Sequence, residues 1–122
     1  MMHIVLSPEA LNDIEQIKDY LICQFGDNTA TKNIKRVIKE IKTLGSFPLK
    51  GSGVWERYGI DSEYRYIYAN KNYIFYRVDE DTVKVIRIID ARRDFLTILF
   101  GSIPQSDEES SEETQKRKSP GN

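Results

Sequence analysis

Hydrophobic residues in the first quarter of the chain follow a short apolar run and then a helical spacing. The run at residues 2–7 ends at Ser7, and the following Pro8 is typical of the first position of a helix whose N-cap is that serine. Apolar positions then recur every three to four residues through 10–25. We therefore predict a strand that leads directly into an amphipathic helix.

A second helical pattern follows a break at residues 25–28. Its apolar positions extend to Leu44, and Gly45 is expected to end the helix in a left-handed conformation. Two amphipathic helices with so short a connection must form an antiparallel hairpin. The face of the second helix opposite its apolar stripe is basic, with Lys32, Lys35, Arg36, Lys39 and Lys42.

After a loop rich in Gly and Pro, the pattern changes to β-branched and aromatic residues. Three such runs, at 63–69, 72–78 and 82–90, are separated by turns too short for any arrangement but antiparallel strands. Residues 92–101 are predicted to form a short helix or extended segment. The predicted fold class is α+β, with the order β-α-α-β-β-β and an antiparallel sheet that the helical hairpin packs against on one face.

Length and composition restrict the class of protein. The chain has 122 residues, of which 39% are hydrophobic and 30% charged, as in a single soluble domain. It contains no apolar run long enough to cross a membrane and no signal-peptide pattern at its N-terminus, so we expect a cytoplasmic protein without membrane contact. With one cysteine and one histidine, no metal site is expected, and no cofactor motif is found.

Charge is distributed unevenly between two parts of the chain. Residues 102–122 contain five acidic and three basic residues and almost no apolar ones, which predicts a disordered charged tail after a folded domain at 1–101. The formal net charge of −1 leaves +1 for the domain, since the tail carries −2. Any binding of nucleic acid by the domain must therefore depend on a local patch.

Arginines and tyrosines on the predicted sheet are the candidate functional residues. Strict alternation along the last strand would place Arg87 on one side with Val83, Val85 and Ile89, and put Lys84, Ile86, Ile88 and Asp90 on the other. One interpretation is structural: each arginine packs its aliphatic stem and pairs with a carboxylate such as Asp90, Asp94 or Glu63. The other is a recognition surface for phosphates, bases or a protein partner. Composition does not separate the two.

The order of these segments resembles the RelE/ParE superfamily of bacterial toxins from type II toxin–antitoxin systems. The resemblance covers residues 2 to about 101 and rests on the helix hairpin, the "FP" and Gly loop, "YRV" followed by an acidic turn, and "RIIDARRD". It implies the same β-α-α-β-β-β fold. It also implies a cognate antitoxin protein as partner, whose C-terminal segment wraps the toxin.

Two activities occur on this scaffold, so the resemblance leaves the target open. RelE-like members are endonucleases that cut mRNA on the ribosome with basic residues of the sheet, and ParE-like members poison DNA gyrase. Nuclease members commonly carry an arginine where this chain has Tyr73, and a late Tyr or His where it has Phe95 and Phe100. The resemblance is therefore closer to the ParE-like branch. The alternatives are the mRNA endonuclease and a non-toxic interaction module on the same fold.

Specific residues follow from each hypothesis. If the protein is a nuclease, Arg65 and Arg93 are the expected catalytic cations. If it is not an enzyme, the residues expected to contact the target or the antitoxin are Arg92, Arg93, Tyr73, Arg77, Phe95, Leu99 and Phe100. Arg87 is expected to be structural, and Asp90 and Asp94 to be the resting partners of Arg92 and Arg93.

Overall fold

A computed structural model describes residues 1–101, so the predicted tail at 102–122 lies outside the described residues. The described part contains a five-stranded sheet in the order β1-β5-β4-β3-β2. In chain order the elements are β1 (His3–Leu6), α1 (Pro8–Phe25), α2 (Asp27–Ser46), β2 (Ser52–Gly53), α3 (Val54–Tyr58), β3 (Arg65–Ala69), β4 (Asn72–Asp79), β5 (Thr82–Asp90) and α4 (Phe95–Phe100). The predicted α+β fold is confirmed, with the short β2 and α3 added in the glycine-rich loop.

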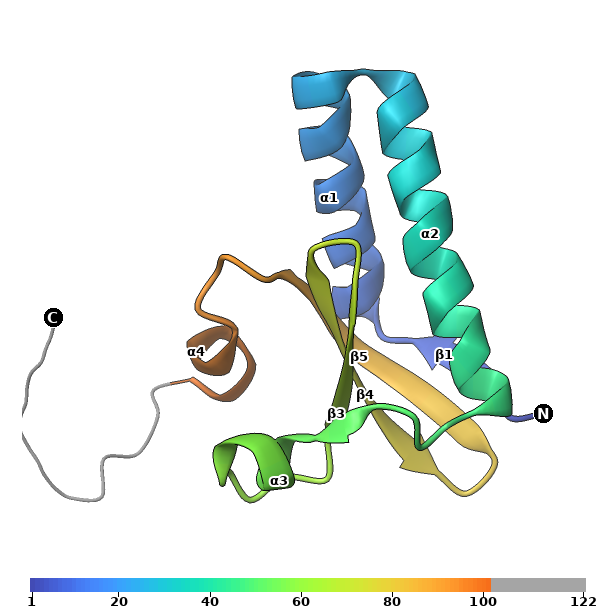
Figure 1. The fold of residues 1–122 in the computed structure, drawn as a ribbon, viewed down its shortest axis with the longest axis vertical. Helices are drawn as coiled ribbons and strands as arrows, with labels where there is room; N and C mark the ends of the chain where they lie inside the picture. Colours follow the sequence, from blue (N-terminus) through green and yellow to red (C-terminus); the bar gives the residue numbers. More distant parts are fainter. Residues whose placement is uncertain (102–122) are drawn as a thin grey trace, which may run out of the picture.

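The helical hairpin begins and turns where the sequence predicts. The Ser7 hydroxyl accepts a hydrogen bond from the backbone N–H of Ala10 at 2.9 Å, with Pro8 at the first helical position. Gly26 separates the helices at a φ of 91°, a conformation that favours glycine. Figure 1 shows that α1 and α2 run side by side and project well beyond one end of the sheet.

The predicted role of Gly45 is wrong. The residue is buried inside the last turn of α2, which continues to Ser46, and its φ is not positive. A Cβ at this position would lie 3.1 Å from Cγ of Met1 and 3.2 Å from the carbonyl oxygen of Met2. Glycine therefore allows the N-terminal segment to approach α2 closely, rather than reversing the chain.

Strands β2 to β5 form an antiparallel meander, and β1 adds to β5 in parallel. The pairing of β4 with β5 shifts register at Phe75 and Tyr76, which pair with Arg87 and Val85 and leave Ile86 unpaired. This irregularity is a β-bulge, and the side-chain alternation predicted for β5 fails there. Before the bulge Val83 and Val85 face the helices, and after it Ile88 does, while Ile89 and Arg87 do not share that face.

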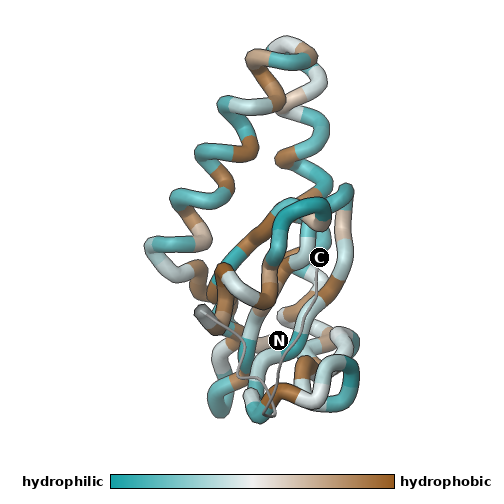
Figure 2. The backbone as a smooth tube through the Cα atoms, turned by 90° about the vertical axis from the view of Figure 1, so that its left-hand side faces the viewer, coloured by the Kyte–Doolittle hydropathy of each residue, from teal (hydrophilic) through white to brown (hydrophobic). Residues whose placement is uncertain are grey.

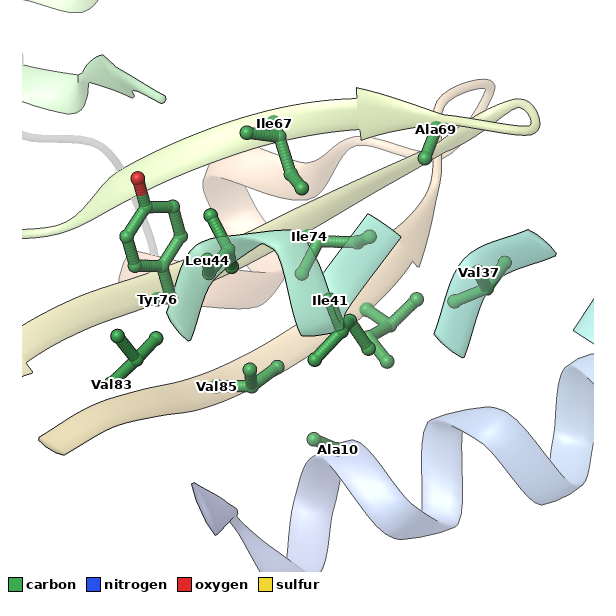
Figure 3. Close-up of a cluster of buried hydrophobic side chains, with 11 residues drawn as sticks. Ala10, Val37, Ile41, Leu44, Ile67, Ala69, Ile74, Tyr76, Val83 and Val85 are labelled. Atoms are coloured by element: carbon green, nitrogen blue, oxygen red, sulfur yellow. The ribbon is translucent and has the colours of Figure 1, made fainter. Parts of the chain in front are cut away.

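The main core lies between the helical hairpin and the sheet. Figure 3 shows Leu44 and Ile41 of α2 among Ile74 and Val85 of the sheet, with Ala10 at the start of α1. Both long helices alternate hydrophobic and hydrophilic positions along their length (Figure 2), because one stripe of each helix packs on this core.

The hairpin packs on one face of the sheet, as predicted, and shorter elements pack on the other face. Phe75, Ile89 and Val54 are fully buried there beneath aromatic residues from β3, α3 and α4. Figure 1 shows α3 and α4 on the side of the sheet away from the hairpin. Within residues 1–101, no helix is long and apolar enough to cross a membrane.

Candidate functional site

A groove of about 1070 Å³ lies between α1, the turn that joins β3 to β4, and the segment that follows β5. Its lining comes from segments far apart in the sequence. The contributing side chains are Asp13, Gln16, Ile17, Tyr20, Leu21 and Phe25 from α1; Thr29 and Asn33 from α2; Tyr68, Asn70, Lys71 and Asn72 around the turn; and Ile88, Asp90, Ala91, Arg92 and Arg93.

The apolar wall of the groove is the uncovered end of α1. The apolar stripe of this helix continues to Phe25, whereas the sheet that covers its first half ends earlier (Figure 1). Tyr20 is 48% exposed and Phe25 is 62% exposed, although both have the large rings that usually pack in an interior. An exposed aromatic wall with a polar rim is typical of a protein-binding surface.

Asp13, a buried residue of the groove lining, forms an ion pair with the partly buried Arg87. Asp13 of α1 accepts hydrogen bonds from Nε and Nη2 of Arg87, at 2.7 and 2.9 Å, and from the backbone N–H of Ile88 at 2.9 Å. β1 pairs with β5 only as far as Val85, so Asp13 replaces the missing strand at this edge. Its hydrogen bond raises the pKa of the Arg87 guanidinium. The structural role expected of Arg87 is confirmed, but with Asp13 as its partner.

The cationic rim of the groove follows β5. Asp90 accepts two side-chain hydrogen bonds from Arg92, at 3.0 and 2.8 Å, and one from its backbone N–H at 2.8 Å. The hydrogen bond from the Arg92 side chain lowers the pKa of the Asp90 carboxyl. The expected pairing of Asp90 with Arg92 is thus confirmed. The side chain of Arg92 remains 75% exposed and can still contact a ligand.

The pairing expected between Asp94 and Arg93 is wrong. Asp94 caps α4 instead, accepting hydrogen bonds from the backbone N–H and the hydroxyl of Thr97 at 3.3 and 2.7 Å. Among residues 1–101, no carboxylate forms an ion pair with Arg93, which is exposed. Arg93 is therefore the more available of the two cations at the rim.

Arg65 and Arg93, the two cations expected in a nuclease, lie at different ends of the sheet. Arg65 pairs with Tyr76 in the ladder, whereas Asp90, just before the Arg92–Arg93 segment, pairs with Asn72. Four residues of strand correspond to about 14 Å. The Arg65 guanidinium points toward the loop after α2, donating to the carbonyl oxygens of Leu49 at 3.2 Å and Gly51 at 2.9 Å.

The other residues expected to contact a partner lie on the outer face of the sheet. Tyr73 and Phe95 have ring centroids 4.6 Å apart, and Phe100 stacks on Tyr64 at 6.0 Å. These rings and Leu99 hold α4 against the sheet and are half-buried. Arg77 pairs with Asp79 at 3.1 Å. A partner contact by these residues remains a prediction.

Sequence reasoning missed most of the groove. Asp13 lies on the apolar stripe of α1, three residues after Ala10 and four before Ile17, and a charged residue in that position was a usable signal of a buried partner. The contribution of Tyr68 and Lys71 had no such signal, because it depends on how the β3–β4 turn meets α2.

Comparison with known proteins identifies the class of this fold and site. Residues 4–95 match the sequence model of the family described as "ParE toxin of type II toxin-antitoxin system, parDE". The match spans most of the chain, and the protein belongs to the ParE toxin family of type II toxin–antitoxin systems. The resemblance to the ParE-like branch is thereby confirmed.

A solved structure supports the fold independently. A chain of the chromosomal ParDE TA system from P. aeruginosa superimposes with a TM-score of 0.64 and 20% sequence identity, covering 74% of this chain and 96% of that one. A comparison with functionally curated proteins finds no match.

Proposed function

We propose that this toxin inhibits growth by acting on DNA gyrase, and that a cognate antitoxin neutralises it by occupying the groove. Membership of the ParE toxin family supports the role of a toxin. The geometry of the site must then favour one of the two activities known in the superfamily, mRNA cleavage or gyrase poisoning. The observation that carries the choice is the position of Arg65. Its guanidinium donates to two loop carbonyls. Arg65 pairs with Tyr76 of β4, four residues or about 14 Å along the strand from Asn72, which pairs with Asp90 just before Arg92 and Arg93.

Catalysis of phosphoryl transfer in an endonuclease depends on cations placed where charge develops in the transition state. A guanidinium that holds a loop at one end of the sheet does not supply this charge jointly with a cation at the other end. Tyr73, which stands where nucleases commonly have an arginine, is packed against Phe95. These features favour a non-nucleolytic toxin, for which gyrase is the target in the ParE-like branch.

The antitoxin assignment rests on the composition of the groove. Its α1 wall is aromatic and aliphatic, and its rim carries Arg92, Arg93 and Lys71. An amphipathic segment with an apolar face and acidic flanks would satisfy both surfaces. The P. aeruginosa structure is of a ParDE system, in which a toxin and an antitoxin occur together.

Expression of the protein alone is expected to arrest growth while cellular mRNA stays intact. Co-expression of the short reading frame beside its gene should restore growth. Primer extension on abundant transcripts after induction shows whether the mRNA has been cut. Codon-phased cuts that appear within minutes and disappear in Arg65→Ala would contradict the proposal and support the endonuclease. Harmless high-level expression would argue against an active toxin of either kind.

A further inference from the structure

The exposed face of α2 carries a line of basic side chains that we call the basic strip, namely Lys32, Lys35, Arg36, Lys39 and Lys42. All five are exposed. At 100° per residue they fall within an arc of about 120° on the side of the helix opposite its buried positions, and they extend over about 15 Å of its axis. The strip is therefore compact, linear and fully accessible.

The basic strip is not neutralised by the domain's own carboxylates. Residues 1–101 contain fifteen Lys and Arg residues, the chain's 18 less three in the tail. Six of the fifteen form ion pairs within the described residues, and none of these six belongs to the strip. Glu40, the acidic residue nearest to the strip on α2, forms an ion pair with Lys50 at 3.5 Å.

Lys71 adds another cation in an unfavourable backbone conformation. It is the second residue of the two-residue turn between β3 and β4, where both Asn70 and Lys71 have positive φ, 53° and 68°. Glycine is the usual residue at that second position, because a side chain is strained there. The side chain of Lys71 is exposed at this turn, so its charge faces the solvent.

The turn is fixed beside α2. The side-chain amide of Asn70 donates to the side-chain oxygen of Asn33, which follows the first residue of the strip. A hollow next to this contact is lined by Arg36, Lys39 and Glu40 of α2 together with Tyr68, Ala69 and Asn70. Lys71 follows Asn70 in this turn and is exposed, so its charge lies at the tip of a turn that contacts α2 beside the strip.

The composition of α2 distinguishes the kind of partner. The exposed large hydrophobic residues of the described chain include four on α1, namely Leu11, Tyr20, Ile22 and Phe25, and none on α2. Protein interfaces bury an apolar centre and are depleted in lysine, whereas interfaces with DNA are polar and strongly basic. The groove wall of α1, with Tyr20 and Phe25, thus suits a protein, and the exposed face of α2 suits a polyanion.

We propose that the basic strip and Lys71 bind the phosphate backbone of double-stranded DNA. A duplex offers one negative charge per about 1.7 Å of its axis, so a line of five cations over about 15 Å can meet several phosphates at once. The inference rests on the proposed function for its setting, since DNA is the substrate of gyrase. The contact itself needs no gyrase, and it is non-specific because no side chain is required to read a base.

Fluorescence anisotropy with a labelled duplex and the full chain, in the absence of gyrase, tests this contact. Six phosphate contacts, five from the strip and one from Lys71, predict that log K falls with log salt with a slope of about −5 to −6. Lys35→Gln/Lys39→Gln should lower the affinity at least 10-fold and reduce the slope by about 2. The matched control Lys18→Gln/Lys84→Gln makes the same change in net charge outside the strip and should bind as wild type. An equal loss of duplex affinity in the strip variant and the control variant, or no duplex binding by the wild type at low salt, would overturn the proposal.

Lys71→Gly provides a second test, in which the melting temperature should rise while the affinity for the duplex falls. Relief of the positive φ should raise the melting temperature, while loss of the charge weakens duplex binding and reduces the salt slope by about 1. Unchanged binding by this variant would remove the turn from the site. If an acidic peptide bound the strip and the duplex did not, the proposed ligand would be wrong. A gyrase assay that succeeds while duplex binding fails would leave the proposed function standing and overturn this inference alone.

Discussion

Replacing Asp13 by alanine is expected to lower the free energy of unfolding by about 2 to 3 kcal/mol, because it removes the partner of a partly buried guanidinium and leaves the buried N–H of Ile88 without an acceptor. Asp13 is 6% exposed and accepts three hydrogen bonds, one of them from the backbone of β5. The variant loses the bridge between α1 and the sheet. Chemical denaturation measures the change.

The matched control is Glu15→Ala on the same helix. Glu15 pairs with Lys18 at 3.9 Å, with side chains 65% and 44% exposed, so its loss should change stability by less than about 0.5 kcal/mol. The double variant Asp13→Ala/Arg87→Met should recover part of the loss, because no unpaired guanidinium remains. An Asp13→Ala protein as stable as the control would show that the pair of Asp13 and Arg87 does not hold the hairpin to the sheet.

Phe25→Asp is expected to weaken binding of the antitoxin about 30-fold to 100-fold, the loss typical of a central aromatic contact. Phe25 lies in the groove wall and is 62% exposed in the unbound protein, so the fold should be unaffected. Titration of the variant with the protein encoded by the neighbouring gene measures the affinity. Its growth-arresting activity should persist, because the substitution leaves the rest of the molecule unchanged.

Phe47→Asp serves as the comparison for this prediction. Phe47 is 65% exposed, follows α2 and does not line the groove, so the same substitution there should leave antitoxin binding near the wild-type value. Equal weakening by both substitutions would mean that the antitoxin covers a wider surface. Normal binding by Phe25→Asp would move the antitoxin out of the groove.

Periodicity predicted the fold because each long element has one apolar side and one strong boundary. Ser7, Pro8 and Gly26 mark the ends of α1 through local backbone chemistry, which a sequence displays directly. The turns of the meander are short, and short turns allow only antiparallel neighbours. These features act within a few residues, so tertiary contacts were not needed to recognise them.

The features that sequence reasoning missed all depend on contacts between distant segments. The bulge at Ile86 changes which side of the sheet Ile88 and Ile89 face, and nothing in their residue types marks it. The possible partners named for the sheet arginines were Asp90, Asp94 and Glu63, yet the partner of Arg87 is Asp13, 74 residues away. The groove likewise exists only because α1 extends past the sheet.

The central claim, a toxin that acts on DNA gyrase, is tested most directly with purified gyrase, supercoiled plasmid and the purified protein. The account predicts that covalent gyrase–DNA complexes accumulate as the toxin is added, seen as linear plasmid after detergent and protease treatment. Addition of the antitoxin should prevent this, and Arg65→Ala should retain the activity if the variant is folded. A toxin preparation that arrests growth but leaves the plasmid uncut, at any excess over gyrase, would contradict the account.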